Sequence, residues 1–156
     1  MNAPRVDGLH HLVVFCHEAS QRYQDAARTV GDPGLRLQFK RLAEARGVTG
    51  ATLSVVGGVS VTHLTVSAPV RVSSPAEEKV RLGGEAEPRP LNKSELHALV
   101  RSLRAYDEDM LAEFRRLRPH AVSEVAATLD LAVEGLMADL DKMRILEDLA
   151  HAPPPR

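Results

Sequence analysis

Histidine, cysteine and glutamate side chains, the residue types that bind transition metals, gather near the N-terminus between His10 and Glu18. Imidazole, thiolate and carboxylate groups together suit zinc or iron. A single helix holds an ion between ligands three or four residues apart, because such positions lie one turn apart. His10 and His17 are seven residues apart, as are His11 and Glu18, and the helical rise separates each pair by ~10 Å. The spacing therefore predicts a polar cluster at the surface or boundary of a helix.

A metal site completed by a second helix or subunit stays open as the alternative to this surface cluster. Its ion would be iron or zinc, and its ligands would come from these side chains: His10, His17, Glu18, His97 and Glu108. The single cysteine, Cys16, is predicted to be a small buried apolar side chain rather than a nucleophile. No basic neighbour is evident in the sequence to lower the pKa of its thiol.

Two other acidic residues, Asp107 and Asp139, fall close to the apolar side of their predicted helices. A buried carboxylate without a partner is costly, so each needs a cation nearby. Arg46 and Arg104 are the candidate partners, and Arg46 is the better one because it falls on an inward-facing position of its own helix. The sequence therefore predicts a buried ion pair that includes Arg46.

The elements that must position these groups are helices, because apolar residues recur at steps of three and four in four segments. The first segment runs from Asp7, a predicted N-cap, to about Val30. Its inward stripe is Leu9, Leu12, Cys16, Ala19, Tyr23, Ala26 and Val30. The second follows the break GDPG, with Asp32 as the cap and Pro33 at the first helical position, and ends near residues 57–58. So short a connection predicts an antiparallel pair of helices.

The third and fourth segments predict a second pair of helices. Asn92 and Glu95 have the spacing of a capping box, which starts the third helix. Pro119 is predicted to open the fourth helix after a very short turn. The inward stripe of the third is Leu96, Leu99, Leu103, Tyr106, Met110, Phe114 and Leu117, and that of the fourth is Val122, Val125, Leu129, Ala132, Leu136, Leu140, Met143 and Leu146.

The stretch between the two pairs, residues 58–90, is rich in β-branched residues and interrupted by proline. Its alternating pattern predicts a β-hairpin-like or irregular insertion that lies over the bundle. The alternative is an arm, 59–72, that pairs with another subunit. The chain is thus predicted to consist of an N-terminal tail at 1–7, a single four-helix-bundle domain at 8–150 with the insertion 58–90, and a disordered Pro-rich tail at 151–156.

Composition limits the partners of such a domain. The chain has 156 residues with 20 basic and 21 acidic side chains, a net charge of −1. Nucleic acid and anionic membranes both attract concentrated positive charge, so neither is expected as a partner. One cysteine, no apolar leader and no long apolar run predict a cytoplasmic protein. A homo-oligomer or a protein partner is expected instead.

Several stretches resemble bacterial ferritin-like four-helix-bundle proteins of uncharacterised function, some of them stress-associated. These stretches are YQDAA, DPGLRLQFKRLAEAR, LGGEAEPRP and YDEDMLAEFRRL. The resemblance implies an all-α, antiparallel four-helix bundle. Ferritin-like di-iron sites use a Glu-x-x-His from each of two helices, and that pattern is absent: Glu44, Glu124 and Glu134 are followed at the third position by Gly47, Ala127 and Met137.

The departure from the di-iron pattern shapes the functional prediction. No standard di-iron centre and no cofactor are expected, and no catalytic residue is predicted. We therefore expect a non-catalytic bundle acting as an interaction, scaffold or stress-associated protein. The alternative is a ferritin-like protein that binds iron or zinc at a non-standard site.

Overall fold

The computed structural model describes residues 3–58 and 91–151; residues 1–2, 59–90 and 152–156 lie outside the described part. Within these two stretches the chain forms four α-helices, one 3-10 turn and no strand. They are α1 (Ala3–Thr29), α2 (Pro33–Gly57), α4 (Lys93–Leu117), η2 (Arg118–His120) and α5 (Ser123–His151). The all-α prediction is confirmed for this part of the chain. The predicted insertion 58–90, the alternative arm 59–72 and the predicted tail 151–156 lie outside the described residues, except for Gly58, which caps α2, and His151, which ends α5.

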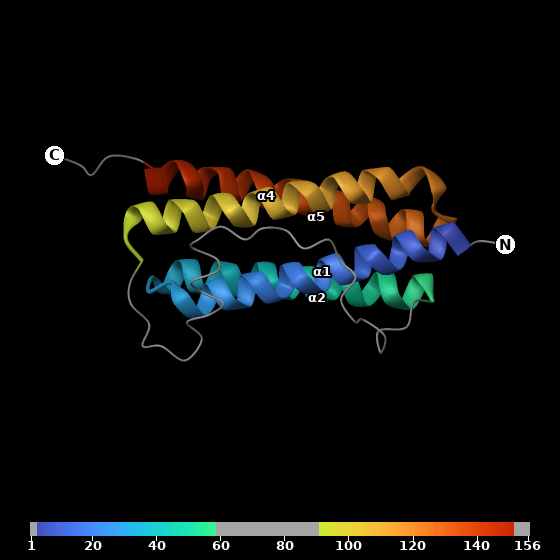
Figure 1. Cartoon of the computed structure of the whole chain (residues 1–156), viewed down its shortest axis with the longest axis horizontal. Helices are drawn as coiled ribbons and strands as arrows, with labels where there is room; N and C mark the ends of the chain where they lie inside the picture. The colour runs from blue at the N-terminus through green and yellow to red at the C-terminus, as the bar shows by residue number, and fades with distance from the viewer. Residues whose placement is uncertain (1–2, 59–90, 152–156) are drawn as a thin grey trace.

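The helices pack as two pairs. In Figure 1 α1 lies along α2, and α4 lies along α5, with the first pair below the second. Contacts between α1 and α4 and between α2 and α5 join the two pairs. The short connection of the first pair lies at the left end of the view, and that of the second pair lies at the right end. All four helices therefore share one interior along their length.

Helix α1 buries the whole stripe that its sequence pattern predicts. Leu9, Leu12, Cys16, Ala19, Tyr23, Ala26 and Val30 are all at most 6% exposed. The helix begins earlier than predicted, at Ala3 rather than at Asp7. The predicted helix start at Asp7 is therefore wrong: the helix already includes residues 3–7, and Pro4 in its first turn is compatible with a helix start.

Helix α2 begins and ends where its sequence signals indicate. The Asp32 side chain accepts a hydrogen bond from the backbone N–H of Leu35 at 2.8 Å. Gly58 closes the helix in a left-handed conformation, with φ of 65°. Gly50 is explained by close packing of α1 and α2, since a Cβ there would lie 3.0 Å from the Cβ of Cys16. Its cost in helix propensity is thus offset by the tight contact between the two helices.

The second pair of helices confirms one predicted start and corrects another. Asn92 and Glu95 form the predicted capping box of α4. Pro119, however, lies in the 3-10 turn η2, and α5 begins at Ser123. Val122, predicted to face inward, is 52% exposed because it precedes the helix. The rest of the predicted α5 stripe is buried or packed against the core.

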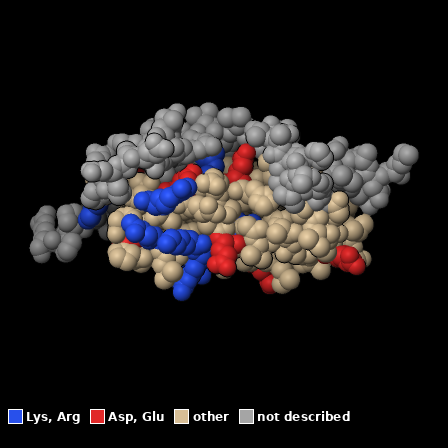
Figure 2. Space-filling view, turned by 90° about the horizontal axis from the view of Figure 1, so that it is seen from below, with Lys and Arg blue, Asp and Glu red and all other residues tan. Residues whose placement is uncertain are grey.

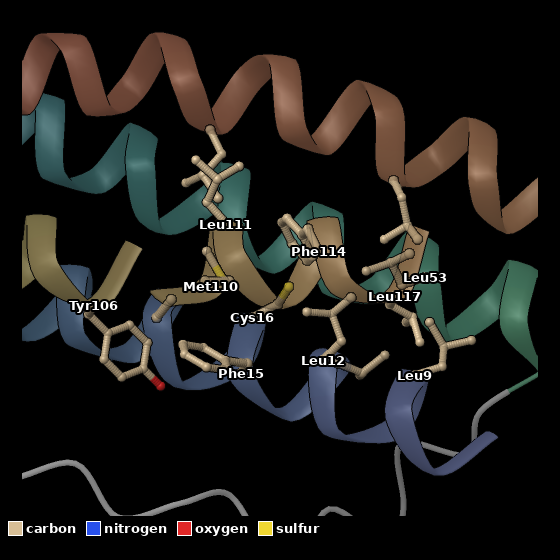
Figure 3. Packing of buried hydrophobic residues seen from close by; sticks show 14 of the residues in the cluster. Leu9, Leu12, Phe15, Cys16, Leu53, Tyr106, Met110, Leu111, Phe114 and Leu117 are labelled. Carbon is tan, nitrogen blue, oxygen red and sulfur yellow. The ribbon is translucent and has the colours of Figure 1, made fainter. Parts of the chain in front are cut away.

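The apolar interior divides into two clusters along the bundle. One cluster contains Leu12, Cys16, Met110, Phe114 and Leu129, part of which Figure 3 shows between α1, α2, α4 and α5. The other contains Phe39, Leu99, Leu103 and Met143. Polar side chains lie among the members of these clusters near the point where the clusters meet, and they form the site described next. Among the described residues, no helix combines the length and apolar character that crossing a bilayer demands.

Candidate functional site: a buried ionic cluster between four helices

Four polar side chains, one from each helix, meet in the middle of the bundle; we call them the central cluster. They are Tyr23 of α1, Arg46 of α2, Asp107 of α4 and Asp139 of α5. The Arg46 guanidinium donates from Nε to Asp107 Oδ1 at 3.2 Å and from Nη2 to Asp107 Oδ2 at 2.9 Å. Its Nη1 donates to Asp139 Oδ2 at 2.8 Å. The Tyr23 hydroxyl donates to Asp107 Oδ2 at 2.5 Å.

The central cluster is largely removed from water. The side chain of Asp107 is 0% exposed, that of Arg46 5% and that of Asp139 16%. One guanidinium thus lies between two carboxylates, and a phenol satisfies the more deeply buried of them. The predicted pairing of Arg46 with Asp107 and Asp139 is confirmed. The forked contact with Asp107 is the geometry in which arginine binds a carboxylate most strongly.

Electrostatics fix the protonation states of these groups. Burial by itself lowers the pKa of Arg46, but the charge of Asp107 and the hydrogen bonds to both carboxylates outweigh it, and the net pKa is raised. Burial, together with the negative charge of Asp107, raises the pKa of Tyr23 well above its ordinary value. At neutral pH Arg46 is therefore a fixed cation and Tyr23 a neutral hydrogen-bond donor.

Asp139 connects the central cluster to the surface. It lines a groove of about 340 Å³ between α2 and α5, together with Leu37, Arg41, Leu42 and Lys142. Figure 2 shows basic side chains gathered toward one end of the face of the bundle that it presents. The groove makes Asp139 the more solvent-accessible of the two carboxylates.

Arg104, the other partner considered from the sequence, lies in a different network. Its Nε donates to Glu147 Oε2 at 2.5 Å and its Nη1 to Glu108 Oε1 at 2.7 Å. The hydrogen bond from Arg104 lowers the pKa of Glu147. Arg104 therefore ties α4 to α5 near the boundary of the bundle and takes no part in the central cluster.

The side chains predicted as alternative metal ligands have different surroundings. Glu18 accepts a hydrogen bond from the Tyr106 hydroxyl at 2.8 Å, Glu108 pairs with Arg104, and His97 Nε2 lies 3.7 Å from Glu147 Oε1. His10 and His17 are half-buried. Within residues 3–58 and 91–151, no group of three or more His, Cys, Asp or Glu side chains is placed to hold an ion.

His17 is the member of this set with an unused polar atom. Its Nε2 is buried, with no hydrogen-bond partner in the described part of the chain. The atom lies against α2, because a Cβ at Gly50 would be 3.6 Å from it. The position is at the edge of the α1–α2 contact, and the half-buried side chain fits the boundary placement that the sequence pattern predicts.

Cys16 lies inside the apolar cluster shown in Figure 3. Its side chain is 0% exposed, and burial raises the pKa of the thiol to about 12. Arg46 lowers this pKa and Asp107 raises it again, so the nearby ion pair does not activate the thiol. The predicted burial of Cys16 is confirmed, and at neutral pH its sulfur is protonated.

The state of Cys16 gives a direct test of the packing around the central cluster. In the native protein at pH 8 we expect an aromatic disulfide reagent to react with Cys16 at least about 100-fold more slowly than in denaturant, because a buried thiol reacts only after opening. The reaction can be followed by the absorbance of the released thiolate. The control is Ala45→Cys in a Cys16→Ala background, since Ala45 is exposed. Equal rates for Cys16 and Cys at position 45 in the native state would contradict the burial.

In comparisons with known proteins, no family model, no protein of described function and no solved structure matches the chain. The central cluster is thus interpreted on its own geometry. The sequence pattern identified three of its four members. It missed the role of Tyr23, which fits an apolar stripe and shows its hydrogen bond only once α1 and α4 are side by side.

Proposed function

We propose that the protein is a non-catalytic, ferritin-like antiparallel four-helix bundle that works in the cytoplasm as an interaction, scaffold or stress-associated protein. The observation that carries the proposal is the central cluster. Its cation, its two carboxylates and its phenol satisfy one another across all four helices. The bundle interior then serves to hold the helices together, and recognition falls to the outer surface.

The positions of the charges support a structural role for the interior. In ferritin-like di-iron proteins, carboxylates on facing helices bind metal cations. Here the guanidinium of Arg46 lies between the carboxylates of Asp107 and Asp139 on facing helices. The Cys16 thiol next to the cluster is held in its unreactive protonated form. These groups stabilise an arrangement rather than present a nucleophile or a base.

The course of the helices supports the ferritin-like arrangement. The two short connections lie at opposite ends of the long axis, so α2 ends and α4 begins at opposite ends of the bundle (Figure 1). Two helical hairpins joined by one long crossover are the layout of ferritin-like bundles. We infer the family likeness from this layout together with the sequence stretches that resemble it.

Binding of iron or zinc is the second candidate function, and the unpartnered Nε2 of His17 is the observation that favours it. The two candidates are separated by purifying the untagged full chain from cells supplied with iron and zinc. For the scaffold function we expect well under one metal ion per chain by elemental analysis. We also expect a second polypeptide, or a second copy of the chain, to co-purify in fixed ratio. A monomer that carries stoichiometric metal and no partner would overturn the proposal.

A further inference from the structure

Helix α5 carries a second apolar face, opposite to the one that packs in the bundle. Its residues follow alternating steps of four and three and form what we call the outer seam: Leu131, Gly135, Ala138, Lys142, Ile145 and Leu149. Leu131 is 70% exposed, Ile145 60% and Leu149 64%. Helical geometry places these positions on one face over about 27 Å. The spacing is that of a helix that packs along another helix.

The bundle itself does not account for this face. The inward stripe of α5 already packs against its neighbours through Leu129, Leu136, Leu140 and Met143. A helix at the surface of a bundle needs one apolar stripe, whereas a helix with two is suited to neighbours on both sides. Three large apolar side chains on this face, Leu131, Ile145 and Leu149, are exposed, and grouped exposed apolar side chains are typical of a contact surface.

Gly135 is an independent sign of a missing neighbour. Glycine is unfavourable in the middle of a helix, and no close packing within the described residues requires one here, because a Cβ at Gly135 would meet none of their atoms within 4 Å. Because their side chains are small, Gly135 and Ala138 leave a shallow depression in the middle of the outer seam. Small residues at such a point let the backbone of a second helix approach closely.

Charge along the seam selects the partner. Glu134, Asp141 and Asp148 are exposed and seven residues apart, so they line one flank of the outer seam. Asp141 also accepts from Arg144 Nη1 at 3.3 Å in an exposed ion pair, and such pairs contribute little, so a partner cation can compete for it. A second copy packed antiparallel would set this acidic flank against itself, and like charges oppose each other there. In a parallel pair the acidic flank would face Ala132, Asp139 and Leu146, and the cations beside Asp139, Arg41 and Lys142, line the α2–α5 groove with it. A partner helix with Lys or Arg repeated along its whole flank therefore complements the acidic flank more completely than a second copy of α5 does.

We propose that the outer seam of α5 docks an amphipathic helix of another protein, with a small and apolar seam and with Lys or Arg along the flank that meets Glu134, Asp141 and Asp148. This inference rests on the proposed interaction function and names the chemistry of the partner. The aliphatic stem of Lys142 packs within the seam while its ammonium group stays at the edge.

The probe is a labelled synthetic helix of four heptads with alternating Leu and Ala along its seam and Lys along one flank. Its binding to the full chain is measured by fluorescence anisotropy at low salt. The matched peptide has the same seam and Glu in place of each Lys. We expect the Lys peptide to bind at least about tenfold more tightly, and the preference to shrink in high salt as the flank charges are screened.

Variants of the chain distinguish binding at the outer seam from non-specific binding of the peptide elsewhere on the protein. Leu131→Glu combined with Ile145→Glu is expected to weaken binding of the Lys peptide on the order of 100-fold, because two of the three large apolar side chains of the seam are lost. Val55→Glu is the matched control, since Val55 is 83% exposed on α2, and it should leave the affinity within about twofold. Gly135→Leu should weaken binding about tenfold while the midpoint of thermal unfolding stays equal or rises.

Four results would overturn the docking proposal. Equal affinity for the two peptides would contradict the requirement for a basic flank on the partner. Undiminished binding by Gly135→Leu would contradict the close approach of the partner helix at Gly135. Light scattering that shows a dimer broken by Leu131→Glu with Ile145→Glu would make a second copy the occupant. If a partner recovered from the producing cells bound this double variant with the same affinity as the natural chain, α5 would not be the docking face. That last result would leave the interaction function itself standing.

Discussion

Replacing Arg46 with methionine is expected to lower the free energy of unfolding by about 3–5 kcal/mol, the range for removing one partner of a buried ion pair. Methionine fills much of the same space, so the loss comes from charge rather than from a cavity. It leaves Asp107, whose side chain is 0% exposed, with the Tyr23 hydroxyl in place of the forked guanidinium contact. Urea unfolding of the full chain, followed by far-UV circular dichroism, measures the change.

The control for this experiment is Arg41→Met on the same helix. Arg41 is exposed at the rim of the α2–α5 groove, so its replacement should change the stability by no more than about 0.5 kcal/mol. The two variants remove the same charge from the same helix and differ in burial. If Arg46→Met were as stable as the natural chain or more so, the central cluster would contribute nothing to stability.

Local signals along the chain were sufficient to predict most of the helical framework. Asp32, Gly58 and the pair Asn92 and Glu95 each satisfy backbone groups at a helix end, and such bonds involve near neighbours in sequence. The inward stripes could be predicted because a helix that packs on one side must repeat its apolar residues every three or four positions. The corrections fall at the ends of helices, where Pro4 and Pro119 are compatible with more than one local structure.

The central cluster could be predicted in part because its charges violate the apolar pattern. Arg46 falls on an inward stripe, and Asp107 and Asp139 fall near theirs, so the cost of burying a lone charge requires that they meet. Tyr23 breaks no pattern, since its ring belongs on the stripe and only its hydroxyl needs a partner. That partner is 84 positions away in the chain, which periodicity does not reveal.

The surroundings of the histidines depend on tertiary contacts in the same way. Periodicity placed His17 on a flank of α1, but its Nε2 is enclosed because Gly50 lets α2 approach closely. Arg104 carries the same charge as Arg46 and was also a candidate partner for Asp107. It binds Glu147 instead because of the way in which α4 and α5 pack. Side-chain partners between helices therefore follow from helix packing and not from spacing within a helix.

The central cluster takes one residue from each helix, so it is suited to fix which helices face one another. An apolar interior pairs with little selectivity, whereas Arg46 finds its two carboxylates in a single arrangement of α2, α4 and α5. Buried polar groups have this role in coiled coils, where they set register at some cost in stability. The central cluster is accordingly expected to contribute more to specificity than to net stability.

If the cluster contributes little to net stability, removing its charges together should restore most of the stability that Arg46→Met alone loses. Replacing Tyr23 with phenylalanine, Arg46 with methionine and Asp107 with leucine removes the buried charge pair and the hydroxyl that would be left without an acceptor. The triple variant is expected to unfold within about 2 kcal/mol of the natural chain, although Arg46→Met alone loses about 3–5 kcal/mol. Asp139 remains, but its side chain is 16% exposed and can be hydrated at the groove. Urea unfolding of the single and triple variants under the same conditions gives the coupling free energy. A triple variant no more stable than Arg46→Met would mean that the charges are not coupled, because the loss would then come from packing alone.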